Sequence, residues 1–533
     1  EADLSIDSIK RIEIIGELAQ RLGLRVDKGA ADADAVVEEL ATRKTLRALV
    51  AWLSERLASS APAKPEPAPE PVPAPAAAAP REVGRYQLVR VPAPMPINGH
   101  SSFAGKRFAI YGDARAEALV ARLEAEQAIV RRLAAGDAIG EVDGYVDLGP
   151  YETPRDMCAM FERVRDAMLA GAQHVFVATR AGGPGGPAGL VKTLAVEAPA
   201  ARVRVIELAD GADAGAVLHG ELHAFDKHVE IGYAGDERTT FELAPATPLA
   251  PGAAPLSADS VVLITGGARG ITARTAVALV ERFGCRVELV GRTPLQATED
   301  PGGDAKALRA QLAKQGVAPA EIEQRVARIL ADREIRDTLA ALGERGTYHA
   351  VDVRDAAFGE LIDAIYARHG RIDAVIHGAG VREDKLMRHK TAESFARVFE
   401  TKLAGARTLA AKLRDDVKLV VWFSSIVGAL GNRGQADYAA AGDALDKLAR
   451  QLQSRIRGRV LSVDWGPWAG TGMVSPELER EYARRGLALI DPARGVDALL
   501  AELAAPAGEP QVILCASDPR ALVKPQPQAA EHA

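Results

Sequence analysis

The chain has 533 residues, of which 48% are hydrophobic and 26% are charged, with 66 basic residues against 72 acidic ones. This length predicts three or four domains, and the balanced charge and low aromatic content argue against a nucleic-acid groove or a polybasic membrane patch. The sequence has no signal-type start, no apolar run long enough for a membrane span and no cysteine spacing typical of disulfides or metal sites. We therefore expect a soluble, cytoplasmic protein that is a piece of a longer chain.

Residues 1–58 carry apolar side chains at helical spacing. Ile9, Ile12, Ile15 and Leu18 share one face of a predicted helix that Ser8 precedes, and two shorter helices are plausible near 33–40 and 45–57. Ser8 could serve simply as the N-cap of this helix, or it could be a functional serine. Residues 59–84 alternate Pro with Ala, Glu and Val, which predicts an extended linker without a core.

Residues 85–255 alternate predicted strands with predicted helices. The strands read RFAIYG, GYVDL, HVFVAT and VRVIEL, and the first helix is expected to be Ala/Leu/Glu-rich and to run to Leu133. No phosphate-binding glycine turn follows the first strand. The glycine-rich stretch at 181–189 comes late, contains two prolines and is expected to be a loop. We expect a Rossmann-like half that is structural rather than catalytic.

The segment 256–525 opens with a strand, a glycine turn and a helix, in the sequence VVLITGGARGIT from Val261. Glycines allow a dinucleotide's pyrophosphate to approach the backbone, and the helix start offers it free N–H groups. A glycine pair alone would be weak, since many tight turns contain one. The residues expected to hold the cofactor here are Thr265, Gly266, Gly267, Ala268, Arg269, Gly270 and Ile271.

The next strand ends at Gly291 and Arg292, where sites that select NAD place an acid. Because the acid is absent and Arg269 is near, we expect NADPH, although both arginines could also be merely solvated. A charged helical insertion is predicted over 304–342. Beyond it we expect adenine contacts from Asp352 and Val353, and nicotinamide-ribose contacts from Gly378, Ala379 and Gly380; His377 is interpreted as a packed or backbone-bonded histidine without a catalytic role.

A serine and a tyrosine 13 positions apart form the predicted catalytic set. An apolar strand delivers Ser425, and a helix begins near Tyr438. A phenol, whose unperturbed pKa is near 10, needs a nearby cation to act as an acid at neutral pH, and Lys402 on a preceding helix can supply it. The loop from Trp465 to Met473, including Pro467 and Trp468, could close over the site or be a packing turn. Asp443 and Asp446 are expected to face solvent.

Residues 85–520 resemble a ketoreductase domain of a type I polyketide or fatty acid synthase, through ITGGARGI, HGAGV, FSSIVGALGNRGQADYAAA and VDWGPWAGTGM. In that family the catalytic lysine precedes the serine strand, as Lys402 does. The start DSIKRIEII resembles the second half of an acyl carrier protein, which implies phosphopantetheine on Ser8. The carrier, linker and long insertion together look most like synthases of polyunsaturated fatty acids.

Three departures from the family pattern stand out. Gly442 replaces the usual Asn four residues after the tyrosine, so a proton relay would use water or Asp443. Thr272 stands where many members have a third glycine. Asp384 keeps the second acid of a Leu-Asp-Asp step, and Leu430 stands where the opposite stereochemical class has Trp, which by resemblance implies a (3R)-hydroxyacyl product.

The expected fold is α/β with two Rossmann-like subdomains: a structural half over 85–255 and an NADP-binding short-chain dehydrogenase/reductase half over 256–525, preceded by the partial carrier over 1–58 and followed by a tail over 526–533. The expected activity is NADPH-dependent reduction of a carrier-bound β-ketoacyl thioester to the (3R)-3-hydroxyacyl thioester, with the parent synthase's other domains as partners and no nucleic-acid, membrane or metal partner. No clustered His, Cys or carboxylate ligand set is expected. The alternatives are a catalytically silent structural domain, which Gly442 favours, and a free-standing sugar or steroid dehydrogenase, which the carrier fragment disfavours.

Overall fold

The computed structural model describes residues 82–96, 102–149, 153–235, 237–295, 301–471, 474, 476–506 and 508–522. The partial carrier with Ser8, nearly all of the linker and the tail predicted over 526–533 lie outside these residues. By their internal contacts, residues 301–333 belong to a different compact unit from the rest of the described chain. The two units are therefore described separately.

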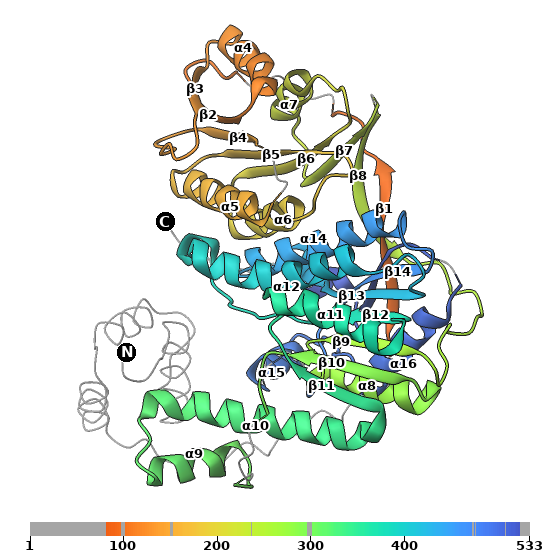
Figure 1. Ribbon diagram of the computed structural model, residues 1–533. Coiled ribbons are helices and arrows are strands. Elements are labelled where there is room, and N and C mark those ends of the chain that lie inside the picture. The colour runs from red at the N-terminus through yellow and green to blue at the C-terminus, as the bar shows by residue number, and fades with distance from the viewer. Residues whose placement is uncertain are drawn as a thin grey trace, which may run out of the picture. The chain divides into compact units, whose positions relative to one another are not determined.

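The larger unit is built on one sheet in which the described residues form 15 strands, in the order β11-β10-β9-β12-β13-β14-β15-β1-β8-β7-β6-β5-β4-β2-β3 (Figure 1). The strands are β1 (Gly84–Pro92), β2 (Arg107–Gly112), β3 (Ile129–Leu133), β4 (Gly144–Leu148), β5 (His174–Arg180), β6 (Arg202–Leu208), β7 (Glu230–Ala234), β8 (Glu237–Pro245), β9 (Val261–Thr265), β10 (Arg286–Gly291), β11 (Gly346–Ala350), β12 (Ala374–His377), β13 (Leu419–Ser425), β14 (Arg459–Trp465) and β15 (Gln511–Cys515).

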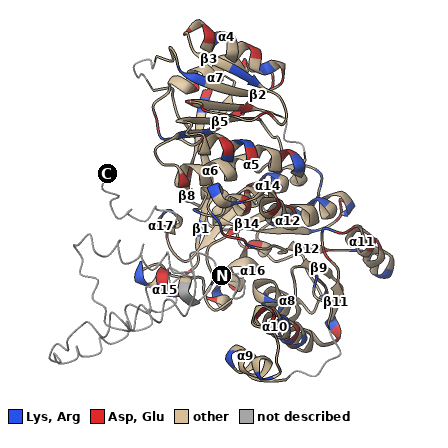
Figure 2. Ribbon diagram, turned by 90° about the vertical axis from the view of Figure 1, so that its left-hand side faces the viewer, with Lys and Arg blue, Asp and Glu red and all other residues tan. Residues whose placement is uncertain are grey.

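Helices connect these strands and cover both faces of the sheet. They are α4 (Glu117–Ala125), α5 (Pro154–Leu169), α6 (Pro187–Glu197), α7 (Ala214–His223), α8 (Gly270–Phe283), α11 (Ala356–His369), α12 (Ala392–Lys412), α13 (Ile426–Leu430), α14 (Ala436–Gln453), α15 (Pro476–Arg484), α16 (Pro492–Ala504) and α17 (Pro519–Leu522), with short 3-10 turns at Ala114–Ala116, Gly343–Arg345 and Met387–His389. Figure 2 shows acidic and basic residues interspersed along these helices. None of the described helices is long and apolar enough to cross a bilayer.

Two parallel α/β halves stand at the ends of this sheet, which confirms the predicted α/β class with two Rossmann-like subdomains. Strands β9 to β15 form the predicted catalytic half and β2 to β6 the predicted structural half, each with parallel pairing throughout. Between them, β1 pairs antiparallel with both β15 and β8, and β7 pairs antiparallel with β8. These three joining strands were not predicted from the sequence.

The helix predicted to run to Leu133 ends at Ala125, so that prediction was wrong at its C-terminal end. Gln127 has a φ of +64°, and the chain then turns into β3, an edge strand paired with β2 from Ile129 onward. A left-handed residue ends an α-helix, and Ile-Val is a favourable start for a strand. The predicted loop at 181–189 is also shorter than expected, because α6 begins at Pro187.

The structural half packs directly onto the helix that carries Tyr438. A Cβ atom added to Gly189 of α6 would lie 2.1 Å from the carbonyl oxygen of Ala439 in α14, so the two backbones touch. Close by, the stacked rings of Phe161 in α5 and Phe395 in α12 have centroids 4.5 Å apart. One apolar core therefore spans helices of both halves and fixes α12 and α14 relative to each other.

The predicted insertion is helical, as expected over 304–342. It consists of α9 (Ala305–Lys314) and α10 (Pro319–Leu342). Within residues 301–333, Leu308, Leu312 and Val326 form a small apolar cluster, and Arg309 pairs with Glu323 at 2.7 Å.

Candidate active site

A cavity of about 780 Å³ opens at the carboxyl ends of β9, β12, β13 and β14. Strand order reverses between β9 and β12, and ligands of open α/β sheets bind in the crevice at such a point. Sequence-predicted residues on its wall are Gly266, Arg269, Gly270, Ile271, Gly378, Gly380, Asp384, Lys402, Ser425, Tyr438, Pro467 and Trp468. Segments that are far apart in the chain thus meet in one hollow.

The three predicted catalytic side chains reach this cavity from three different elements. Ser425 is the last residue of β13, Tyr438 lies in the first turn of α14, and Lys402 lies in the middle of α12. The Lys402 Nζ atom lies 4.9 Å from the centroid of the Tyr438 ring and donates a hydrogen bond to the Phe423 carbonyl oxygen at 2.8 Å. Lys402 is only 3% exposed, so its ammonium is held in a fixed position beside the phenol.

His377 supports Lys402 from behind, as a fully buried, hydrogen-bonded histidine. Its Nε2 atom lies 2.8 Å from the carbonyl oxygen of Lys402, and its Nδ1 atom lies 2.6 Å from the Thr265 hydroxyl. Because a carbonyl only accepts, Nε2 carries the proton and Nδ1 accepts from the hydroxyl. Burial lowers the pKa of His377 to about 4, so the ring is neutral at pH 7 and serves a positioning role.

The glycine turn of the predicted cofactor site is pressed against the end of β12. Gly266 has a φ of +67°, and a Cβ atom there would lie 2.6 Å from the carbonyl carbon of Gly378, so only glycine fits. Thr272, in the place of a third glycine, donates to the carbonyl oxygens of Gly266 and, at 2.9 Å, Arg269. The threonine hydroxyl therefore ties the start of α8 to the glycine turn.

A smaller cavity of about 190 Å³ continues from this turn toward β10 and β11. Its wall contains the predicted residues Gly266, Gly267, Arg269, Gly291, Arg292, Asp352, Val353, Ala379 and Gly380. Thr265 and Ala268 support this wall from behind, since both are fully buried. The close glycine backbone and the adjoining N-terminus of α8 have the features that fit the pyrophosphate of a dinucleotide.

Glu334, in α10, is a site residue that the sequence analysis missed. Its Oε1 atom accepts the Gly270 backbone N–H at 2.6 Å, and its Oε2 atom pairs with Arg269 Nε at 3.1 Å. The carboxylate occupies the anion position at the N-terminus of α8, where a cofactor phosphate would also bind. Nothing in the sequence pattern of the insertion marked this residue.

Only one of the two residues predicted to control product stereochemistry lines the larger cavity. Asp384 lies on the wall of the larger cavity, where its carboxylate accepts from Gln435 Nε2 at 3.0 Å and pairs with Arg382 at 3.3 Å. Leu430 does not line this cavity; it packs against an apolar cluster that includes Ile426 and Ile513.

Asp443 and Asp446 are buried, so the expectation that they face solvent was wrong. The Asp443 carboxylate accepts the Gly186 N–H at 2.6 Å and is directed toward α6, away from the cavity, so the structure does not support it as a proton relay. Asp446 accepts from Ser462 at 2.6 Å, and burial raises its pKa to about 6. Helix α14 is covered on several sides by both halves, which no periodicity argument revealed.

Gly442 is required by packing. A Cβ atom there would lie 2.8 Å from the Cα atom of Gly428 in α13. Of the predicted closing loop, Trp465 and Trp468 pack edge to face at 4.9 Å, with Trp468 only 2% exposed, while Met473 lies outside the described residues.

Part of the chain is similar in sequence to known proteins. Residues 260–470 match the family described as KR domain. The chain is 33% identical over 342 residues to a subunit of the polyunsaturated fatty acid synthase of Thraustochytrium sp., covering 58% of this chain and 12% of that protein. It is 35% identical over 246 residues to polyketide synthase GfsA of Streptomyces halstedii, covering 45% of this chain and 3% of that protein. The chain therefore spans a small part of these relatives.

Solved structures share the fold. A ketoreductase from the first module of phoslactomycin biosynthesis in Streptomyces sp. HK803 superposes with a TM-score of 0.63 at 24% identity, covering 82% of this chain and 94% of that one. A ketoreductase domain from the bacillaene assembly line superposes with a TM-score of 0.60 at 23% identity, covering 81% of this chain and 97% of that one.

Proposed function

Since the chain contains a KR domain of the kind found in polyketide and polyunsaturated fatty acid synthases, we propose that it reduces a carrier-bound β-ketoacyl thioester to the (3R)-3-hydroxyacyl thioester with NADPH. One observation carries the proposal: the Lys402 ammonium lies 4.9 Å from the Tyr438 ring, in the cavity that Ser425 also lines. The carrier with Ser8 and its phosphopantetheine, and the synthase's other domains, are part of the same proposal.

Each side chain has a separate role in the proposed carbonyl reduction. When bound, NADPH supplies the hydride to the carbonyl carbon. Ser425 donates a hydrogen bond to the ketone oxygen and orients it, and Tyr438 gives that oxygen its proton. Lys402 stabilises the phenolate that remains, and His377 keeps the backbone of Lys402 in place through the hydrogen bond at 2.8 Å. Arg269 and Arg292 are the candidate partners of the cofactor's 2′-phosphate.

The experiment is NADPH oxidation at 340 nm with a short β-ketoacyl thioester, run beside NADH, with chiral analysis of the product. Replacing Tyr438 with Phe, or Lys402 with Met, is expected to lower kcat by roughly 10²- to 10⁴-fold, the usual contribution of general acid catalysis. The matched controls are Tyr366→Phe in the same half, which lines neither cavity, and Lys412→Met, whose side chain is 39% exposed on the same helix as Lys402. Wild-type turnover in Tyr438→Phe would refute the assignment.

The alternative is a silent structural domain, which the missing Asn at position 442 favours. NADPH binding without turnover on any β-ketoacyl thioester would support that alternative. Turnover with a (3S) product would keep the reductase and contradict the role given to Asp384.

A further inference from the structure

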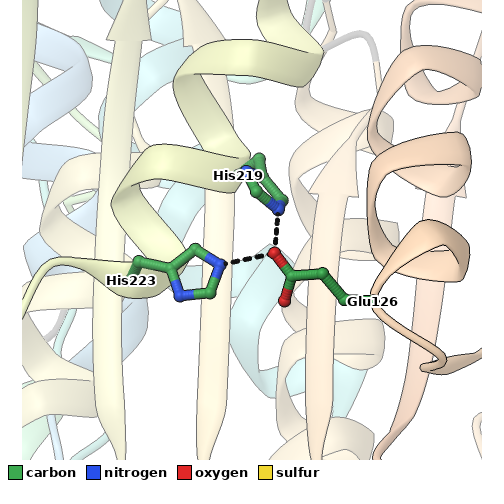
Figure 3. Close-up of side chains that lie close together, drawn as sticks. All are labelled: Glu126, His219 and His223. Carbon is green, nitrogen blue, oxygen red and sulfur yellow. Dashed lines mark hydrogen bonds and ion pairs between the residues drawn. The ribbon is translucent and has the colours of Figure 1, made fainter. Parts of the chain in front are cut away.

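Three side chains of metal-binding type gather in the structural half, far from the reductase site in the chain. They are Glu126, at the end of α4, and His219 and His223 of α7 (Figure 3). Their ligand atoms all lie within 4.8 Å of one another, and this is the one such group that the described residues contain. No clustered ligand set was expected from the sequence, and this expectation was wrong.

The sequence does carry half of the signal. His219 and His223 are four positions apart, and residues at that spacing lie on the same face of a helix, one turn from each other. Glu126 comes from a different helix, some 93 residues earlier than His219, so no spacing rule could add it. Only the packing of α4 against α7 completes the set.

Both imidazole Nε2 atoms lie against the same carboxylate oxygen of Glu126. The Oε1 atom of Glu126 lies 2.7 Å from the Nε2 atom of His219 and 3.0 Å from the Nε2 atom of His223. Ligands of a tetrahedral zinc ion with bonds of about 2.0–2.2 Å are separated by roughly 3.3 Å, so each of the two Glu126–His separations would lengthen by about half an ångström or less to admit the ion. Without a metal, the same carboxylate accepts hydrogen bonds from two imidazole N–H groups.

The ligands lie between closely packed helices and remain partly accessible. The side chains of His219, His223 and Glu126 are 23%, 11% and 31% exposed. The ring of Phe103 lies 4.7 Å from that of His223. The two helices touch backbone to backbone, because a Cβ atom on Gly215 would lie 2.7 Å from the carbonyl carbon of Ala118. The site is therefore nearly preformed, with a side open to solvent for a water ligand.

We propose that Glu126, His219 and His223 bind one zinc ion that joins α4 to α7. Two neutral imidazoles and one carboxylate, with water in the fourth position, are a known ligand set for zinc, whereas magnesium and calcium prefer oxygen ligands alone. The ion neutralises the carboxylate and replaces its two hydrogen bonds with coordinate bonds. It lies outside both reductase cavities, whose walls contain none of the three residues, so its role is structural.

The test is zinc binding by the full chain without a polyhistidine tag, measured by competition with a chromophoric chelator and by metal analysis after dialysis. We expect one zinc ion per chain in the wild type. His219→Gln and Glu126→Gln should each weaken zinc binding by about 100-fold or more, and His228→Gln, in the same half but outside the cluster, should bind as the wild type does. Zinc at about 100 times its Kd should raise the ratio of folded to unfolded wild-type chain about 100-fold, because only the folded state is preformed to bind it.

A second readout removes dependence on folding of the variants. Cobalt(II) in place of zinc should give the visible absorption of a four-coordinate site in the wild type and in His228→Gln, and this absorption should be lost in both cluster variants. Zinc affinity that is equal in the wild type and both cluster variants, or a wild type that binds no zinc after dialysis, would overturn the proposal. Circular dichroism of each variant at 25 °C shows whether a loss of binding is a loss of fold.

Discussion

A buried ion pair at the start of α14 gives the sharpest stability prediction. The Lys390 Nζ atom lies 2.6 Å from the Asp437 carboxylate, and the two side chains are 0% and 1% exposed. Asp437 directly precedes Tyr438, and its other oxygen accepts the Tyr438 backbone N–H at 2.8 Å. Burial raises the pKa of Asp437 to about 6, although Lys390 and this N–H favour the ionised form. Removing the ammonium by Lys390→Met leaves the carboxylate buried without its counter-charge.

The loss of unfolding free energy can be estimated because the buried Asp437 carboxylate can take up a proton once the ammonium is removed. Taking up a proton at pH 7 from an unfolded-state pKa near 3.9 costs about 4 kcal/mol, and breaking a buried pair typically costs about 3–5 kcal/mol. We therefore expect Lys390→Met to lose about 3–5 kcal/mol of unfolding free energy at pH 7. Lys412→Met, which removes an exposed lysine paired with Asp363, should lose less than about 1 kcal/mol.

The pH dependence of the stability of Lys390→Met tests whether protonation of Asp437 is the cause. In Lys390→Met the folded state holds a proton on Asp437 that the unfolded state releases, so this variant's stability rises as the pH falls. The wild-type carboxylate is still ionised above pH 6, so the deficit should shrink by about 1.4 kcal/mol per pH unit from pH 8 to pH 6, then level off. Urea unfolding at each pH measures it. A deficit below about 1 kcal/mol, or one independent of pH, would refute the reasoning.

Three further predictions concern single residues. Glu334→Gln should lower the Kd for NADPH about fivefold, since a half-exposed charge that competes with phosphate is worth about 1 kcal/mol, and the control Asp337→Asn on the same helix should leave the Kd unchanged. A fluorescence titration in which Glu334→Gln has the wild-type Kd would contradict this. His377→Gln should be less stable than the wild type by an unfolding free energy that shrinks by about 2 kcal/mol between pH 7 and pH 5, because the pKa of His377 is lowered to about 4 in the folded state and the wild type therefore loses stability as the pH falls below 6.5. Urea unfolding that shows the same difference at both pH values would contradict this. Gly442→Ala should destabilise the fold by about 1–3 kcal/mol, since its Cβ would meet the α13 backbone at 2.8 Å, whereas Gly220→Ala, whose Cβ has a nearest neighbour at 3.6 Å, should be stabilising. Urea unfolding in which Gly442→Ala is the more stable of the two variants would contradict this.

Local sequence determined the parallel α/β halves and much of the site. The strand, glycine turn and helix from Val261 are a continuous local pattern, so the position of the turn follows from the order of residues along the chain. The 13-residue separation of Ser425 and Tyr438 is likewise short enough to read along the chain. Lys402 was reached through a chemical requirement, the cation beside a phenol, together with the family resemblance.

The tertiary structure decided what depends on contacts between distant segments. The burial of Asp443 and Asp446 follows from the packing of α6 against α14, and the antiparallel strand β1 is defined by partners 147 to 431 residues away. Glu334, in the insertion, contacts the N-terminus of α8, and Glu126 contacts His219 and His223 from another helix. Periodicity reports which face of an element is apolar, but it does not report which other element will cover that face, and polar side chains find their partners only once that packing is set.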